Sequence, residues 1–496
     1  MSFVQNFPFF SIILGLVCAV VSFVLPHRLC RPISIGFLSA SVCMQSAVLY
    51  LCASNNLCYT YMMGHYPAPW GNEIISGVLE PLMALVFSVA MLLSVLGGSR
   101  HIALDVRENS QALYWVMVDL TLVSLLALCY TNDIFTGYVF IEICTIASCA
   151  LIASRNNGRA LIASIRYMVF ALVGSGLFLI GVIFTYSITG HLLFPQLHST
   201  ISALWKAETY HFSMTTAIAL MTVGLGIKSG LFPFHIWMPD TYGRSTPASA
   251  SILSGVVSKG YTFLLIKIIY RAVGTQVFYA TGVQNILLAM GIGGMIVCSM
   301  FAIRTRHLTG MVAYSSAAQM GYIFMGIGMG TDAGMLATIL QILNHAITKP
   351  MLFLSSAQLS DASGRRMDFQ RLRGAGHRNP AAGVSFTIGA LSMVGMPILS
   401  GFIPKLYFAR DAFTLSWQTW PILLGLCIST VLNVLYFLYT AVLIWLPQEE
   451  NSPYGRARIY LGECVPCFIF AALNLFVGLC PGIMVNLVHQ GLTLLH

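Results

Sequence analysis

The stretch "GIKSGLFPFHIWMPD", residues 226–240, places Lys228 and His235 in a run of residues that otherwise has the composition of a membrane span. An ammonium group at the centre of a membrane helix costs roughly 2.5–3.5 kcal/mol on insertion scales. Pro233 removes a backbone donor just before His235, and carbonyl groups freed inside a membrane must be satisfied by protein or water. The stretch therefore predicts a broken helix, with a water-lined region near His235.

Composition predicts an integral membrane protein in the lipid bilayer. Of the 496 residues, 57% are hydrophobic and 8% are charged, whereas soluble domains carry about 25% charged residues. Apolar runs of about 20 residues, long enough to cross a bilayer as helices, recur along the whole chain. They predict an all-α fold of fourteen transmembrane helices, near residues 8–26, 33–53, 77–98, 112–130, 134–153, 162–188, 212–233, 247–270, 277–301, 309–329, 333–357, 381–403, 419–446 and 460–487.

The net charge of +9 does not indicate nucleic-acid binding, because the charges are sorted by loop. Most arginines fall in alternate loops, and the opposite loops hold only Lys206, Arg271 and Arg410. This bias follows the positive-inside rule and predicts a multi-pass protein with both termini on the outer side. The basic tract 362–379 is either a docking surface on the inner side or a solvated face.

A set of lysines is left over, in or beside the predicted spans: Lys228, Lys259, Lys267, Lys349 and Lys405. The spans also hold Asp119 and Glu142. Lysine gives up its proton readily when it is desolvated, whereas arginine stays charged. Ionisable groups inside a membrane are functional candidates by default, so the set favours a proton relay.

Some of these residues have simpler interpretations. Lys267 lies near the end of its span, where it is expected to snorkel to the interface. Asp119 either makes a local cap or pair, or takes part in function. A purely structural ion pair of Glu142 with one lysine would leave the other lysines unexplained.

His345 and Lys349, in "NHAITKP" at 344–350, are four residues apart and share one helix face. Pro350 follows at once and disturbs the helix. A lone histidine in a span is usually a packing residue. With a lysine one turn away, and with Asn344 and Thr348 close by in the sequence, a relay role for His345 is at least as well supported.

The chain carries an internal repeat. "SGLFP" at 229–233 matches "SGFIP" at 400–404, and each lies next to a lysine, Lys228 in the first copy and Lys405 in the second. Matched broken helices in two halves indicate a transport site at the midplane. The repeat divides the chain into an N-terminal flank of three helices (1–110), a first unit (111–275), a second unit (276–450) and a C-terminal helix (451–496). Because each unit has an odd number of helices, the two copies are expected to be inverted.

At this point the sequence resembles a known family, the antiporter-like membrane subunits. These include the large proton-pumping subunits of respiratory complex I, Mrp-type sodium/proton antiporters and the membrane arms of related hydrogenases. The resemblance covers nearly the whole chain. It is carried by residues 228–271, by "NDIFTGYVFIEICTIASCALIAS" at 132–154, by "HLTGMVAYSSAAQMGYIFMG" at 307–326 and by "GMPILSGFIPKLYF" at 395–408.

The resemblance implies fourteen helices in two inverted five-helix repeats, with helices seven and twelve broken around a hydrated polar axis. It implies location in a prokaryotic plasma membrane. Some members carry glutamate where this chain has Lys405, which favours the antiporter D-type and hydrogenase-linked branches. With His235 added from the broken helix, the residues expected to carry protons are Glu142, Lys228, His235, Lys259, His345, Lys349 and Lys405.

The expected partners are other membrane subunits, protons, sodium as a second candidate ion, and a peripheral iron–sulfur or hydrogenase arm if the complex is redox-driven. No cofactor or metal is expected in the chain itself, because it has no dinucleotide fingerprint after a strand and no cluster-binding cysteine set. Two settings stay open: a redox-driven complex, of the NADH dehydrogenase or hydrogenase type, and an Mrp-type antiporter. A stand-alone transporter of an organic solute is a distant alternative, since it would not need the lysines.

Overall fold

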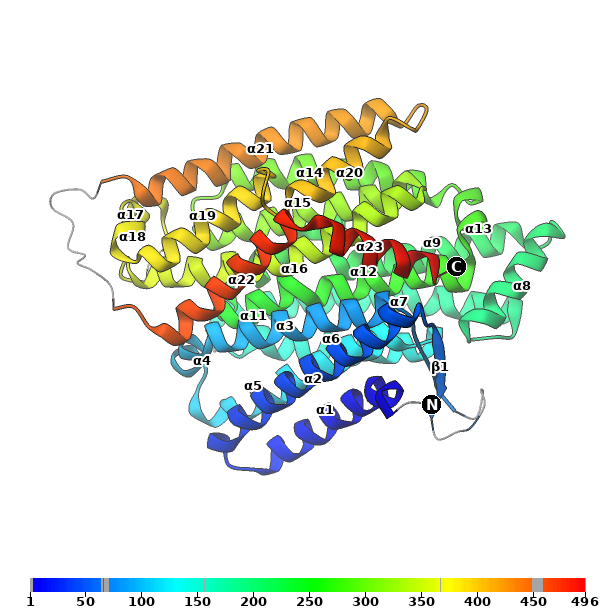
Figure 1. Ribbon diagram of the computed structural model, residues 1–496, viewed down its shortest axis with the longest axis horizontal. Helices are drawn as coiled ribbons and strands as arrows, with labels where there is room; N and C mark the ends of the chain where they lie inside the picture. Colours follow the sequence, from blue (N-terminus) through cyan, green and yellow to red (C-terminus); the bar gives the residue numbers. More distant parts are fainter. Residues whose placement is uncertain are drawn as a thin grey trace.

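The computed structural model in Figure 1 describes residues 3–63, 66, 71–155, 157–365, 367–447 and 458–495. Arg366, in the basic tract, lies outside them. The described residues fold into a bundle of helices with one small antiparallel hairpin, β1 (Tyr59–Met62) with β2 (Glu73–Ser76). Both termini lie at one end of the bundle, near β1, and the opposite end carries α4, α17 and α18.

The N-terminal flank packs against α5 along one side of the bundle. Its helices are η1 (Phe3–Asn6), α1 (Phe7–Val24), α2 (His27–Asn55), α3 (Leu79–Gly97) and α4 (Ser99–Asp105).

The predicted first unit (111–275) contains two long helical segments that are interrupted along their length, His211–Arg244 and Pro247–Val273. Its helices are α5 (Glu108–Tyr130), α6 (Ile134–Ala153), α7 (Gly158–Thr189), α8 (Phe194–Lys206), α9 (His211–Ser229), η3 (Phe234–Ile236), α10 (Trp237–Arg244), α11 (Pro247–Ile252), η4 (Leu253–Val257), α12 (Ser258–Lys267) and η5 (Ile268–Val273).

The second unit and the C-terminal segment complete the bundle. Their helices are α13 (Thr275–Ala280), α14 (Val283–Arg304), α15 (Leu308–Met329), α16 (Asp332–Asp361), α17 (Phe369–Leu372), α18 (Ala375–Arg378), α19 (Pro380–Val394), α20 (Phe402–Ala412), α21 (Thr419–Trp445), α22 (Leu461–Leu479) and α23 (Pro481–Thr493).

Within the described ranges, 11 helical segments are long and apolar enough to cross a membrane. The other three predicted spans, 309–329, 333–357 and 381–403, coincide with α15, with α16 and with α19 and its continuation. Compared with the 11 segments, α19 is shorter. The helices α15 and α16 are more polar, because their buried faces are rich in serine, threonine and glutamine. The all-α membrane fold is confirmed, and the count of fourteen stays a prediction.

The helices are interrupted at both copies of the repeated motif. α9 ends at Ser229, where Gly230 takes a left-handed conformation with φ of 79°, and the chain resumes helical structure at Phe234. α19 ends at Val394 with Gly395 at φ of 94°, and α20 begins at Phe402. Positive φ is cheap only for glycine, so these glycines fix where each helix stops.

The centre of the bundle is formed by α16 and by the segment from α11 to η5. Every residue of the most apolar 18-residue window in Pro247–Val273 is buried, and α16 is buried from Gly334 to Ser360. By contrast, α7 and α21 expose apolar side chains, among them Val169, Leu435 and Tyr439. Helices of this second kind face lipid, and the central helices carry the buried Lys259, Lys267 and Lys349.

Candidate functional site

Lys228 and Glu142 meet between α9 and α6. Nζ of Lys228 lies 3.4 Å from Oε1 of Glu142 and donates a 2.6 Å hydrogen bond to Oγ1 of Thr145. The Lys228 side chain is fully buried, whereas that of Glu142 is 25% exposed. Thr145 lies one turn after Glu142 and presents its hydroxyl on the same face. Gly174 of α7 leaves room for the lysine, since a Cβ there would lie 3.0 Å from Cγ of Lys228.

The two helices that carry Lys228 and Lys259, α9 and α12, are joined by a hydrogen bond between two hydroxyl groups. Thr262 donates to Oγ of Ser229, the neighbour of Lys228, at 3.3 Å. Lys259 is fully buried and donates to Oγ of Ser258 at 2.9 Å and to the Ser254 carbonyl. Ser254 lies in η4, a π-helical turn, and such turns are frequent at functional sites.

Two adjacent serines of α15 connect Lys259 to Lys349. Oγ of Ser254 lies 2.9 Å from Oγ of Ser316. Lys349 donates to the neighbouring Ser315 hydroxyl and, at 3.2 Å, to the carbonyl of Val312. Every member of this group lies at 0% exposure, so water does not compete for these bonds.

His345 lies one turn before Lys349 on α16 and is also at 0% exposure. Within the described ranges, neither of its ring nitrogens has a hydrogen-bond partner. Buried polar groups in native proteins are almost always paired, with protein or with ordered water. The role of His345 as a proton carrier stays a prediction.

Asn344 is the centre of a polar cluster that leads to the second helix break. Its Oδ1 accepts from Thr348 at 3.1 Å and from Ser400 at 2.7 Å. Asn474 of α22 donates to Thr348 at 2.7 Å and to Ser392 at 3.0 Å. The cluster therefore ties α16, α19, α22 and the break before α20 together.

Lys405 lies at this break. We call the series Lys228, Lys259, Lys349 and Lys405 the lysine line. Nζ of Lys405 donates to the carbonyls of Met393 and Val394, at 3.0 and 2.8 Å, and lies 5.4 Å from the centre of the Tyr322 ring. These carbonyls end α19 and would otherwise lack a partner. Among the described residues, no carboxylate lies within 4 Å of the ammonium groups of Lys259, Lys349 or Lys405.

His235 is placed apart from this line. It is buried in η3, with its ring 5.7 Å from that of Phe232 and 6.3 Å from that of Phe301. In the part of the chain that the structure describes, His235 makes no hydrogen bond to any of the lysines. Its role as a proton carrier stays a prediction.

The expectation that Lys267 snorkels to the interface is wrong. Lys267 is at 0% exposure and donates to the carbonyls of Cys129 and Thr131, at 2.7 and 2.5 Å. Arg271, expected in an outer loop, is instead 9% exposed in η5 and lies 2.9 Å from Glu80. The reason is that the helix continues past Lys267 as a π-helical segment and carries both cations into the bundle.

Asp119 lies midway along α5 at 0% exposure. Its Oδ2 accepts a 2.8 Å hydrogen bond from Ser34 of α2, and its Oδ1 has no partner among the described residues. Asp119 therefore makes a local pair with a neutral group, and it is separate from the lysines.

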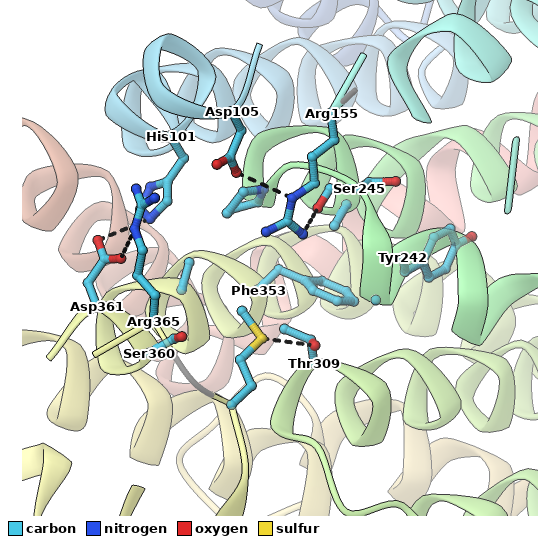
Figure 2. Close-up of a pocket in the computed structure, with 15 residues that line it drawn as sticks. His101, Asp105, Arg155, Tyr242, Ser245, Thr309, Phe353, Ser360, Asp361 and Arg365 are labelled. Atoms are coloured by element: carbon cyan, nitrogen blue, oxygen red, sulfur yellow. Dashed lines mark hydrogen bonds and ion pairs between the residues drawn. The ribbon is translucent and has the colours of Figure 1, made fainter. Parts of the chain in front are cut away.

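Sequence reasoning missed a cluster at the arginine-rich end (Figure 2). Nε2 of His101 lies 3.2 Å from Oδ2 of Asp361, and Nε of Arg155 lies 3.5 Å from Oδ2 of Asp105. The side chains surround a cavity of about 60 Å³ that Tyr242 also lines. Only the long-range fold brings α4 beside the end of α16, so no local pattern in the sequence could reveal this cluster.

Comparison with known proteins assigns the family. The family described as "NADH:quinone oxidoreductase/Mrp antiporter, TM" matches residues 131–432. This chain belongs to that family. Among relatives of this antiporter-family chain, NADH-quinone oxidoreductase subunit N of Desulforudis audaxviator is 31% identical over 81% of this chain and 80% of its own length. The D subunit of the Na(+)/H(+) antiporter of Bacillus subtilis is 28% identical over 85% and 83%.

Solved structures of two membrane complexes contain chains with the same fold. A chain of the archaeal membrane-bound sulfane sulfur reductase, 24% identical, superposes with a TM-score of 0.87 over 98% of this chain and 96% of its own. A chain of the Mrp complex from Dietzia sp. DQ12-45-1b, 20% identical, gives 0.86 over 99% and 97%. The predicted family is thus confirmed.

Proposed function

We propose that this chain moves protons across the membrane as one subunit of a multi-subunit ion-translocating complex. The observation that carries the proposal is the Glu142–Lys228 pair at 3.4 Å, from which hydroxyl and amide groups lead to Lys259, Lys349 and Lys405. The family, with relatives named as subunits of a quinone oxidoreductase and of an antiporter, supports it.

The pair acts as the switch of this mechanism. An ionised Glu142 stabilises the ammonium form of Lys228 by opposite charge. If Glu142 gains a proton, or if α6 and α9 separate, Lys228 is left charged in a site that excludes water. It then releases its proton towards the hydroxyls of Ser229 and Thr262, while Thr145, whose hydroxyl donates to the Ile141 carbonyl at 2.8 Å, holds the lysine in place.

Hydroxyl groups and carbonyl groups have different roles along the line. A hydroxyl both donates and accepts, so it can take up a proton on one side while releasing another. The hydroxyls of Ser258 and Ser315 accept from Lys259 and Lys349, and Ser315 in turn donates to the Val312 carbonyl at 2.7 Å. The carbonyls of Ser254 and Val312 only accept, and so they hold the lysines in their charged form.

The energy required is within reach of such groups. Moving one charge against 100 mV costs about 2.3 kcal/mol, and breaking a buried ion pair by removing one partner costs about 3–5 kcal/mol. Repulsion between neighbouring ammonium groups adds to the driving force, since several lysines share one buried line.

We further propose fourteen transmembrane helices with two inverted five-helix repeats, 111–275 and 276–450, between the flanks 1–110 and 451–496. The two interruptions, one beside Lys228 and one beside Lys405, support the repeat. The arginine distribution supports placing both termini on the outer side of a prokaryotic membrane.

The complex is either redox-driven or an Mrp-type antiporter. Gentle purification from the native membrane, followed by mass spectrometry of the accompanying proteins, distinguishes the two. Iron–sulfur or hydrogenase subunits would identify a redox-driven pump. Small membrane subunits alone would identify an antiporter, and sodium would be the next ion to measure.

The transport proposal is tested in inside-out vesicles that contain the whole complex, with a pH-sensitive dye inside. The Lys228→Met variant should abolish proton uptake while its subunits still copurify. Wild-type rates of proton uptake in this variant would overturn the proposal.

A further inference from the structure

A large cavity opens at the arginine-rich end of the bundle. It has a volume of about 1060 Å³ and lies between the end of α14, the start of α15, α17 and the second half of α21. Arg304 is the last residue of α14 and Leu308 the first of α15. The cavity therefore lies where the membrane-spanning helices end, at the level of lipid headgroups.

The rim of this cavity is strongly basic. Arg304, Arg306 and Arg371 all line it, and all three are exposed. Arg304 and Arg306 form no ion pair with any described residue. The one carboxylate in the lining, Asp368, lies 2.9 Å from Nδ1 of His307. The rim thus carries an excess of positive charge.

The wall of the same cavity is apolar and continues onto the lipid-facing surface. Ile303, Leu435 and Tyr439 line it and are 42%, 55% and 60% exposed. One turn further along α21, Leu438 and Val442 are also exposed. Tyrosine is enriched at the level of headgroups because it has an apolar ring and a polar tip.

We propose that this cavity binds an anionic phospholipid. The phosphate lies against Arg304, Arg306 and Arg371, and an acyl chain follows Ile303, Leu435 and Tyr439 along α21. Basic pockets between helices on the inner side are suited to anionic headgroups. A free anion would use the rim but leave the apolar wall uncovered, and a neutral lipid would leave Arg304 and Arg306 without a counter-charge.

The experiment is native mass spectrometry of the intact complex, titrated with phosphatidylglycerol or with phosphatidylcholine of the same chain length. The test variant is Arg304→Gln/Arg306→Gln/Arg371→Gln. The control, Arg28→Gln/Arg31→Gln/Arg159→Gln, removes equal charge from the same end of the bundle but outside the cavity. Arg304→Lys/Arg306→Lys/Arg371→Lys keeps the charge and checks that the site still folds.

We expect phosphatidylglycerol to bind in preference to phosphatidylcholine. The glutamine variant should weaken this binding on the order of a hundred-fold, since each basic residue near the surface contributes several-fold. The control should match the wild type, and the lysine variant should retain most of the binding. Leu435→Gln should weaken the binding of phosphatidylglycerol but not the binding of inorganic phosphate.

Three outcomes would overturn the proposal. The glutamine variant and the control could bind phosphatidylglycerol equally, which would show non-specific attraction. Inorganic phosphate could displace the lipid at similar concentration, which would indicate a free-anion site. Cross-linking from an Arg371→Cys variant could capture an acidic subunit of the complex in place of lipid, which would indicate a protein interface.

Discussion

Lys228 and Glu142 are held 3.4 Å apart by two different helices, and Thr145 supplies a second oxygen 2.6 Å from the same ammonium. Among the described residues, this is the place where a lysine of the buried line touches a carboxylate. The other lysines are held by hydroxyls and carbonyls. Within the described ranges, the carboxylate that contacts these lysines is thus at one end of the series, beside Lys228.

Removing one partner of this pair should cost more than removing both. Glu142→Gln or Lys228→Met should each abolish proton uptake and lower the free energy of unfolding, by about 3 kcal/mol for Glu142→Gln, because a buried ammonium is left unpaired. The double variant should recover much of that stability and none of the transport. Thermal unfolding and vesicle uptake measure the two effects, and additive losses of stability would contradict the coupling.

The hydroxyl pair Ser254–Ser316 should control the rate between Lys259 and Lys349. Ser254→Ala should slow proton uptake by roughly ten-fold, within the range that positioned proton-transfer groups contribute, and should raise the solvent isotope effect. Ser124→Ala removes a buried serine of α5 whose hydroxyl, among the described residues, bonds its own helix, at 2.7 Å to the Leu120 carbonyl. It should transport normally, and equal slowing in both variants would argue against a relay.

Gly174 should be intolerant of substitution. A Cβ there would lie 2.8 Å from the Gly224 carbonyl oxygen and 3.0 Å from Cγ of Lys228. Gly174→Ala should therefore push α7 from α9, destabilise the protein by about 1–3 kcal/mol and impair uptake. Gly176→Ala is the matched control on the same helix, since its Cβ would meet no described atom within 4 Å. Wild-type behaviour of both would show that α9 can shift freely.

Asp119 should matter for structure and leave transport unchanged. Asp119→Asn keeps an oxygen for the Ser34 hydroxyl, so thermal stability and uptake should both stay near wild type. Asp119→Leu removes that acceptor and should cost about 1–3 kcal/mol, the penalty for a buried unpaired group. Loss of uptake in Asp119→Asn, with stability intact, would place this carboxyl in the proton path.

Local sequence patterns predicted much of the line but not its connections. The intramembrane lysines stand out because lipid makes each of them costly, and the spacing of His345 and Lys349 puts them on one helix face. The bond between Ser254 and Ser316, and the contacts of Asn474, join residues far apart in the chain. Serine in a membrane helix usually bonds its own backbone, so nothing local distinguishes these serines from the others.

The errors have a common physical origin. Lys267 and Arg271 lie where the hydropathy of the sequence falls, and such a fall predicts the end of a membrane helix. In the structure the π-helical segment η5 carries them inward, where Glu80 pairs with Arg271 and two carbonyls hold Lys267. Because Glu80 and the two carbonyl groups provide polar partners inside the bundle, the helix continues beyond the residue at which the apolar run ends.

The charge of Lys405 affects how two helices are held together. Its ammonium, on α20, donates hydrogen bonds to the last two carbonyl groups of α19, across the break between these helices. A neutral amine offers fewer and weaker donors than an ammonium. If Lys405 carries protons as proposed, each proton that leaves it also weakens the attachment of α19 to α20, so proton release and the positions of these two helices are coupled.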